Sequence, residues 1–132
     1  MPSCETTNRI LHFYHIRSYK GVGLSLIHIK GVGKLKLKQI STHIYKLTVE
    51  TTVGIPIIIN TWYVVNGDNV YIIDTGMASY ADMQIRTAQL LGTPQAIFLT
   101  HGHLDHINGA KKISESLNIP IYAHEKELPY IN

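Results

Sequence analysis

The most informative segment of the sequence is Thr100-His101-Gly102-His103-Leu104-Asp105-His106-Ile107-Asn108-Gly109-Ala110. It holds the four side chains that we call the array: His101, His103, Asp105 and His106. Imidazole nitrogen and carboxylate oxygen are the ligands that Zn²⁺ and neighbouring transition metals accept. Four such side chains cannot pack this closely in a hydrophobic core, since each buried polar group would need its own partner. The array therefore predicts a metal site, against the simpler alternative of a histidine-rich surface loop.

The residues on either side of the array indicate how the site is built. Residues 96–100 form a short apolar run, which is typical of a buried strand in a sheet covered on both faces. After the array, apolar residues recur at helical spacing up to Leu117. We therefore expect a strand-to-helix turn at the carboxyl end of a buried strand, where α/β sheets place their ligands. The first two histidines would face one side and Asp105 with His106 another, which suits two metals about 3.5–4 Å apart.

Residues 100–110 resemble the signature of the metallo-β-lactamase superfamily of metallohydrolases. Residues 69–76, with the sequence NVYIIDTG, resemble that family's earlier aspartate-containing motif, and the order of elements over residues 61–123 also matches. The resemblance extends over residues 40–132. It implies an α/β fold of layered α+β type, the αββα sandwich of that family, with only the amino-terminal half present.

The resemblance also implies roles for individual residues. His101 and His103 would bind a first metal, and Asp105 and His106 a second. Asp105 would in addition act in catalysis, by orienting the attacking water or transferring a proton. Asp74 would lie behind the metal ligands and anchor their loop, although an Asx turn with the two following residues accounts for it equally well. The implied cofactor is Zn²⁺, with two ions in the complete site; iron or manganese suits the same ligand types.

Downstream of the array the chain departs from the family pattern. The family completes its site with a further histidine, a bridging aspartate and a last histidine, whereas after His106 this sequence offers only His124. His124 follows an expected strand and lies too close to the array to match the missing histidine, so an exposed histidine at a strand end is the favoured interpretation. The sequence therefore indicates the amino-terminal part of a larger enzyme.

The implied function is metal-dependent hydrolysis of an ester-type bond, such as a thioester or lactone, in a small-molecule substrate. Two alternatives stay open: a non-catalytic metal-binding fragment, and a nuclease or RNA-processing relative, since the superfamily includes such enzymes. A homodimer that assembles a full site from two halves is a further alternative.

Composition places the chain of 132 residues among globular proteins, with 45% hydrophobic and 16% charged residues. No apolar stretch is long enough to span a bilayer and no signal-peptide pattern is present, so we expect no membrane association. The single cysteine, Cys4, excludes an internal disulfide and favours a cytoplasmic location.

Charge divides along the chain. Residues 1–50 hold eight basic and two acidic side chains, a net of +6, while residues 51–132 hold four basic and seven acidic ones, a net of −3. We expect residues 1–38 to form a basic, loosely ordered appendage and residues 39–132 to belong to the metallo-β-lactamase-like domain. Lys34, Lys36 and Lys38 alternate, which favours the solvated face of an edge strand over contact with nucleic-acid phosphates.

The remaining elements follow from local patterns. Residues 43–50 and 57–65 have the composition of strands, and Asn66-Gly67 predicts a hairpin turn with positive φ. A helix should follow, begun by a capping box of Ser79 and Asp82 and ended at Gly92.

Overall fold

The computed structural model of the chain describes residues 15–19, 24–29, 33–53 and 55–131. Strands and helices are mixed along the chain, as the α/β prediction requires. The chain forms two compact units, Met1–Asn60 and Thr61–Asn132. The array and Asp74 both lie in the second unit. No helix in the described part of the chain is long and apolar enough to cross a membrane.

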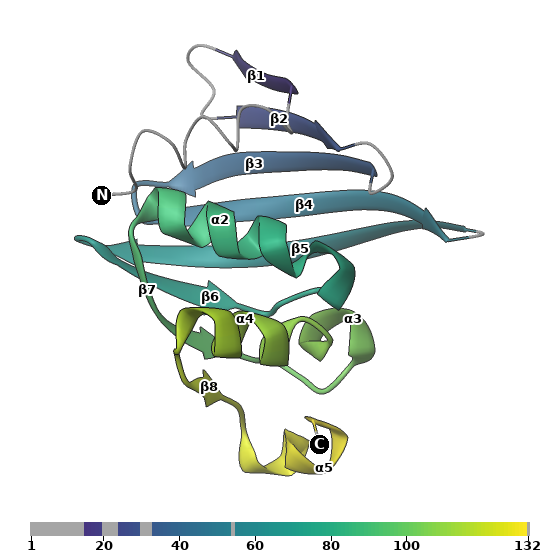
Figure 1. Cartoon of the computed structure of the whole chain (residues 1–132), viewed down its shortest axis with the longest axis vertical. Helices are drawn as coiled ribbons and strands as arrows, with labels where there is room; N and C mark the ends of the chain where they lie inside the picture. Colours follow the sequence, from purple (N-terminus) through teal and green to yellow (C-terminus); the bar gives the residue numbers. More distant parts are fainter. Residues whose placement is uncertain (1–14, 20–23, 30–32, 54, 132) are drawn as a thin grey trace. The chain divides into compact units, whose positions relative to one another are not determined.

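The first unit contains an antiparallel series of strands. They pair in sequence order: β1 (His15–Tyr19), β2 (Leu24–Ile29), β3 (Gly33–Ser41) and β4 (Ile44–Val53) (Figure 1). Side chains alternate between the faces of a strand, and Leu35 and its cross-strand partner Val49 are buried. Lys36 Nζ lies 3.4 Å from Glu50 Oε1. The strand expected over residues 43–50 is confirmed as β4.

The strands of the first unit bear on two expectations for the amino-terminal segment. β3 pairs with β2 on one side and with β4 on the other, so its alternating lysines do not lie on an edge strand. That prediction was wrong because alternation reports one solvated face of a strand and says nothing of its neighbours. The domain boundary expected after residue 38 falls inside β3. The loose order of residues 1–38 stays a prediction, since residues 1–14, 20–23 and 30–32 lie outside the described residues.

The second unit begins within β5, at Thr61, and consists of the rest of a hairpin followed by two parallel crossovers. β5 (Ile55–Asn66) and β6 (Asn69–Ile73) form the expected hairpin, with Asn66 paired to Asn69. The two loop residues are Gly67 and Asp68, and of these only Gly67 has positive φ, at 60°. A glycine with positive φ at the first loop position fits a type II′ turn. The asparagine of the Asn-Gly pair therefore ends the strand instead of entering the turn.

Parallel pairing extends the sheet beyond β6. The chain passes from β6 through η1 (Ala78–Tyr80) and α2 (Ala81–Leu91) to β7 (Thr93–Phe98), then through α3 (Leu104–Ile107) and α4 (Ala110–Leu117) to β8 (Ile121–Tyr122). It continues into η2 (Glu125–Glu127) and α5 (Leu128–Ile131). Figure 1 shows α4 in front of β6 and β7. Parallel strands end at the same edge of a sheet, so the carboxyl ends of β6 and β7 lie together.

One face of this sheet forms the core of the second unit. Val70, Ile72 and Ile97 are fully buried, as are Ala88 of α2 and Ile113 of α4. On the other face the described residues include an aromatic pair: Phe98 and Tyr122 stack with ring centroids 5.2 Å apart and are 40% and 53% exposed. Among the described residues, helices pack on one face of this strand, and the second face, which was expected to be covered, is partly exposed here.

The helix expected after Ser79 is present, but its start differs. Ser79 lies in the 3-10 turn η1, and α2 begins after Tyr80 without a capping hydrogen bond from any described side chain. The 3-10 turn leads directly into α2. The N–H of Ala78, at the start of this turn, donates to Asn108 Oδ1 at 2.7 Å. The capping box was wrong; the end of the helix at Leu91, before Gly92, is confirmed.

Candidate metal centre

The array occupies the turn between β7 and α3. His101 lies in the connecting loop, His103 directly precedes α3, and Asp105 and His106 lie in the single turn of that helix. His103 has extended backbone with φ −72° and ψ 143°, and its carbonyl accepts hydrogen bonds from the N–H groups of His106 and Ile107. The four side chains are thus held at a change from extended to helical backbone.

The imidazole rings of His103 and His106 both lie beside the ring of His101. The centroids of His101 and His106 are 4.1 Å apart, and those of His101 and His103 are 4.5 Å apart with the planes nearly perpendicular. Asp105 joins the edge of this group, with its Oδ2 at 3.6 Å from His106 Nε2. The structure therefore places the array's side chains as neighbours, with His103 and His106 beside His101 and Asp105 beside His106.

Asp74 lies behind the rings, at the end of β6. Its backbone has φ 62° and its N–H donates to the carbonyl of Phe98 on β7 at 2.9 Å. The carboxylate is buried and accepts from Thr100 N–H at 2.9 Å on Oδ1 and from His106 Nδ1 at 2.8 Å on Oδ2. The Thr100 hydroxyl lies 2.9 and 2.8 Å from the two oxygens. The side chain thus bonds to Thr100 and His106, which is the position expected of a residue that anchors the ligand loop.

This network assigns the protons on two of the rings. His106 donates from Nδ1 to a carboxylate, so the lone pair of its neutral ring is on Nε2. The Thr100 hydroxyl donates to Asp74, and its oxygen, 2.8 Å from His101 Nδ1, accepts the proton of that nitrogen. Asp74 therefore fixes His106 directly and His101 through Thr100, and both rings present Nε2 as a metal-binding lone pair.

Backbone contacts hold the two motifs against each other. Thr75 donates from both its N–H and its hydroxyl to the carbonyl of His106, each at 2.8 Å, and Gly109 N–H donates to Gly76 O at 3.0 Å. A Cβ on Gly109 would lie 2.7 Å from the carbonyl oxygen of Thr75, so this close approach requires glycine. The site thus rests on main-chain hydrogen bonds in addition to the side chain of Asp74.

Asp74, His101 and His106 each offer a ligand atom within 4.8 Å of the others. Geometry alone would allow a metal among these three. The carboxylate of Asp74 already accepts from two other residues, however, whereas the imidazoles present free Nε2 atoms. The Nε2 atoms of His101 and His106 therefore remain as open donor atoms, whereas the oxygens of Asp74 are already engaged in hydrogen bonds.

The pKa of Tyr80 is higher than that of a free tyrosine. Burial of the side chain raises this pKa most, and the nearby negative charge of Asp105 raises it further. Tyr80 therefore keeps its hydroxyl proton at neutral pH and faces Asp105 as a neutral side chain.

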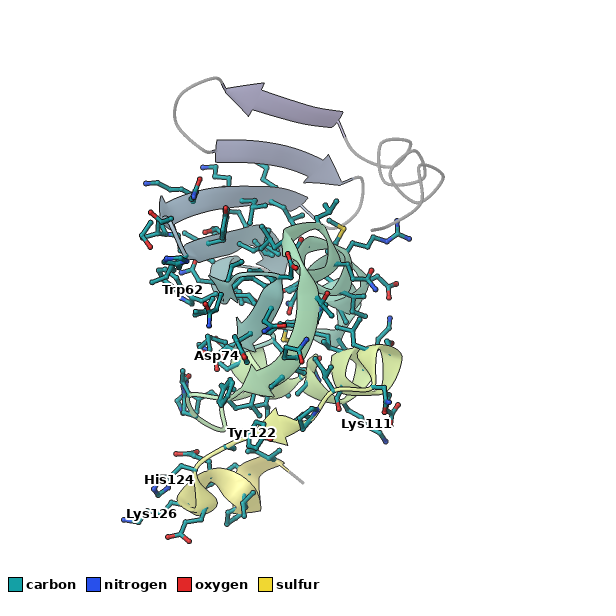
Figure 2. The ribbon with its side chains drawn as sticks, turned by 90° about the vertical axis from the view of Figure 1, so that its left-hand side faces the viewer. Trp62, Asp74, Lys111, Tyr122, His124 and Lys126 are labelled. Carbon is teal, nitrogen blue, oxygen red and sulfur yellow. The ribbon has the colours of Figure 1, made fainter. Side chains whose placement is uncertain are left out.

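Two residues near the array were not found from the sequence. The sequence pattern identifies Thr100 only as the end of the strand. A hydroxyl directly before the first histidine is nevertheless a local signal for a residue that fixes the orientation of the histidine ring. Glu127 accepts a hydrogen bond from Gly102 N–H through Oε2 at 2.9 Å, and the two are 25 positions apart, so no local pattern points to it. His124 is exposed and its Nδ1 accepts from Lys126 N–H at 3.2 Å, which agrees with the interpretation as a strand-end histidine. Figure 2 shows it well away from Asp74.

Comparison with known proteins identifies the family. The sequence profile of the Metallo-beta-lactamase superfamily matches residues 54–132. The chain is 51% identical over 98 residues to the Probable metallo-hydrolase YybB of Bacillus subtilis (strain 168), a match that covers 74% of this chain and 44% of that protein. It is 34% identical over 70 residues to the Hydroxyacylglutathione hydrolase of Wigglesworthia glossinidia brevipalpis, covering 52% of this chain and 27% of that protein.

The fold is also similar to that of solved structures. A metallo-beta-lactamase from Erythrobacter litoralis superposes with a TM-score of 0.66 over 88% of this chain and 47% of that one, at 22% sequence identity. The chain spans less than half the length of each of these three proteins. The family profile covers more than half of the chain and includes the whole array, and the chain therefore belongs to the metallo-beta-lactamase superfamily.

Proposed function

We propose that this chain carries the metal-binding half of a hydrolase that cleaves an ester-type bond in a small molecule. The observation that supports it most strongly is the hydrogen-bond network around Asp74, which leaves the Nε2 atoms of His101 and His106 free beside a third imidazole and a carboxylate. A histidine cluster without a ligand to bind would have no need of fixed ring protons.

The donor set fits the cofactor of this proposal. Imidazole nitrogens and one carboxylate suit Zn²⁺, and they also suit iron or manganese. His101 and His103 would hold one ion and Asp105 with His106 a second. When bound, such a metal lowers the pKa of its water to about 7 and polarises the scissile carbonyl.

The chain's own residues supply the positioning and the proton chemistry. Asp105 has a side chain 50% exposed, so its carboxylate is open to a water molecule and to substrate. It would orient the attacking water and accept its proton, as a general base.

The substrate class is drawn from a relative's name. The Hydroxyacylglutathione hydrolase of Wigglesworthia acts, by that name, on an acylated glutathione, so a thioester is the first substrate to test and a lactone the second. A cytoplasmic location is part of the same proposal and is supported by the single cysteine.

Zinc titration followed by calorimetry tests the metal assignment. The wild-type chain should bind zinc, and the double variant His101→Ala/His103→Ala should lose that binding, because two of the array's imidazoles are gone. His124→Ala is the matched control, since this histidine is exposed and lies outside the array. Equal zinc uptake by the wild type and the double variant would overturn the proposal, because other histidines would then hold the metal.

A further inference from the structure

The carboxyl-terminal segment of the chain lies against the ligand loop, residues 101–103. Gly102, which separates the first two histidines of the array, donates its N–H to Glu127 Oε2 at 2.9 Å. The same glycine lies so close to α5 that an added Cβ would be 2.6 Å from Tyr130 Cβ. Two separate contacts therefore join η2 and α5 to the middle of the loop.

The glycine at this position has two consequences. No other residue fits against Tyr130, since a real Cβ does not approach another carbon to within 3.0 Å. Glycine also has the greatest backbone freedom of any residue, so the peptide that connects two metal ligands is the least restrained by its own sequence. Rotation of that peptide would change the orientation of His101 relative to His103, so a contact from outside the loop can hold the two residues in place.

We propose that Glu127 is a positioning residue for the metal ligands, acting through its hydrogen bond to Gly102. This inference rests on the proposed function, because it concerns the same metal site. The carboxylate accepts the main-chain N–H and so fixes the orientation of the peptide between His101 and His103. A charged acceptor forms a stronger hydrogen bond than a neutral one, and the bond is partly shielded from water. Tyr130 restricts the loop from the same side.

Alternative roles for Glu127 predict different behaviour. As a direct metal ligand it would need its charge, and glutamine would not replace it. As a positioning residue it needs only an acceptor oxygen of the same reach, which glutamine has. The conservative variant Glu127→Gln therefore separates the two roles.

The test compares zinc binding by full-length variants in calorimetry. Glu127→Ala should bind zinc about tenfold more weakly than wild type, the loss typical of removing a residue that orients a ligand. Glu127→Gln should stay close to wild type. Glu125→Ala is the matched control, an exposed glutamate in the same 3-10 turn, and should have no effect.

Two further measurements distinguish positioning from general destabilisation. The visible absorption spectrum of the Co²⁺-loaded chain should change shape in Glu127→Ala and not in Glu127→Gln, because it reports ligand geometry. Amide hydrogen exchange at Gly102 should be faster in metal-free Glu127→Ala than in wild type. If Glu127→Ala does not fold, Glu127→Asp takes its place, because its carboxylate is one methylene shorter and is withdrawn from Gly102.

The outcomes separate this inference from the proposed function. Equal zinc affinity in wild type and Glu127→Ala would overturn it while leaving the metal site in place. Equal weakening in Glu127→Gln and Glu127→Ala would also overturn it, in favour of a role through charge. Failure of the proposed function shows instead as undiminished zinc uptake by His101→Ala/His103→Ala, a result that does not involve Glu127.

Discussion

Asp74 satisfies several hydrogen-bond donors with a single buried carboxylate, and it does so from a backbone conformation that most residues avoid. Its φ of 62° is tolerated by aspartate and asparagine better than by alanine. The position thus combines a requirement on the backbone with one on the side chain.

Different substitutions of Asp74 should therefore lower the free energy of unfolding by different amounts. Asp74→Ala should lower the free energy of unfolding by about 1–3 kcal/mol, because the partly buried donors on Thr100 and His106 lose their acceptor and alanine is strained at positive φ. Asp74→Asn should lower the free energy of unfolding by less, since asparagine keeps one acceptor oxygen and tolerates the positive φ. Urea unfolding in the presence of a chelator measures both; equal losses in the two variants would contradict this account.

Thr100 should affect metal binding more than stability. Thr100→Val removes the hydroxyl that connects His101 Nδ1 to Asp74 and keeps the N–H that donates to Asp74 Oδ1. The ring of His101 is then free to adopt the wrong tautomer, and zinc affinity should fall about tenfold. Thr100→Ser, which retains the hydroxyl, is the control and should bind like wild type. A valine variant with unchanged affinity would show that the hydroxyl has no part in fixing the ring.

At the scale of elements, the close contact between the Asp74 loop and the start of α4 depends on the absence of one side chain. Gly109→Ala should lower the free energy of unfolding by about 1–3 kcal/mol, because its Cβ would overlap the backbone oxygen of Thr75, which has no freedom to move aside. Gly67→Asn is the control: it also replaces a glycine, at φ 60°, but in open space and with a residue that accepts positive φ. Equal losses in the two variants, measured by urea unfolding, would contradict the steric explanation.

The elements also show what the sequence could and could not predict. Strand β4, the β5–β6 hairpin, the helix ending before Gly92 and the turn that holds the array all follow from local periodicity and from glycine and asparagine chemistry. The start of α2, the neighbours of β3 and the exposed face of β7 do not, because each depends on residues distant in sequence. Asp74 could be singled out by its resemblance to a motif, but its hydrogen bond to His106 spans 32 positions and that of Gly102 to Glu127 spans 25.

For the molecule as a whole, two buried tyrosines should determine stability in alkaline solution. Burial raises the pKa of Tyr63, against a smaller lowering by its hydrogen bond with Thr87, and burial raises the pKa of Tyr80. The unfolded chain loses these protons near pH 10 while the folded chain keeps them, so stability is full below pH 10 and declines above it.

For Tyr63, which is fully buried, the decline should approach about 1.4 kcal/mol per pH unit, and Tyr80 should add to it in the same direction. Tyr63→Phe should make it shallower, because one of the two groups no longer ionises. Urea unfolding between pH 9 and 11 checks this, with Tyr130→Phe, an exposed tyrosine, as the control. An identical pH dependence in Tyr63→Phe and wild type would contradict the assignment.

The 132-residue chain should be a poor catalyst even when it binds zinc. On the proposed assignment the array would give two protein ligands to each of two ions, whereas catalytic zinc usually has three. Turnover of thioester, lactone and phosphodiester reporter substrates by the purified chain with added zinc should therefore be negligible. Zinc-dependent turnover that rises with the square of protein concentration would contradict this and would show that two copies complete one site.

The hydrogen bonds of the site also imply an order of assembly during synthesis. Asp74 is added first, Thr100 and His106 follow after 26 and 32 residues, and Glu127 comes last, 53 residues after Asp74 (127 − 74). At the usual 5–20 residues per second, the ribosome takes about 3–10 s to cover that distance. During this interval the nascent chain gains its anchoring carboxylate before its histidines, and its histidines before the acceptor for Gly102. A metal ion captured early would therefore meet the histidines after their anchoring carboxylate has been added and before Glu127 is present to restrain the loop.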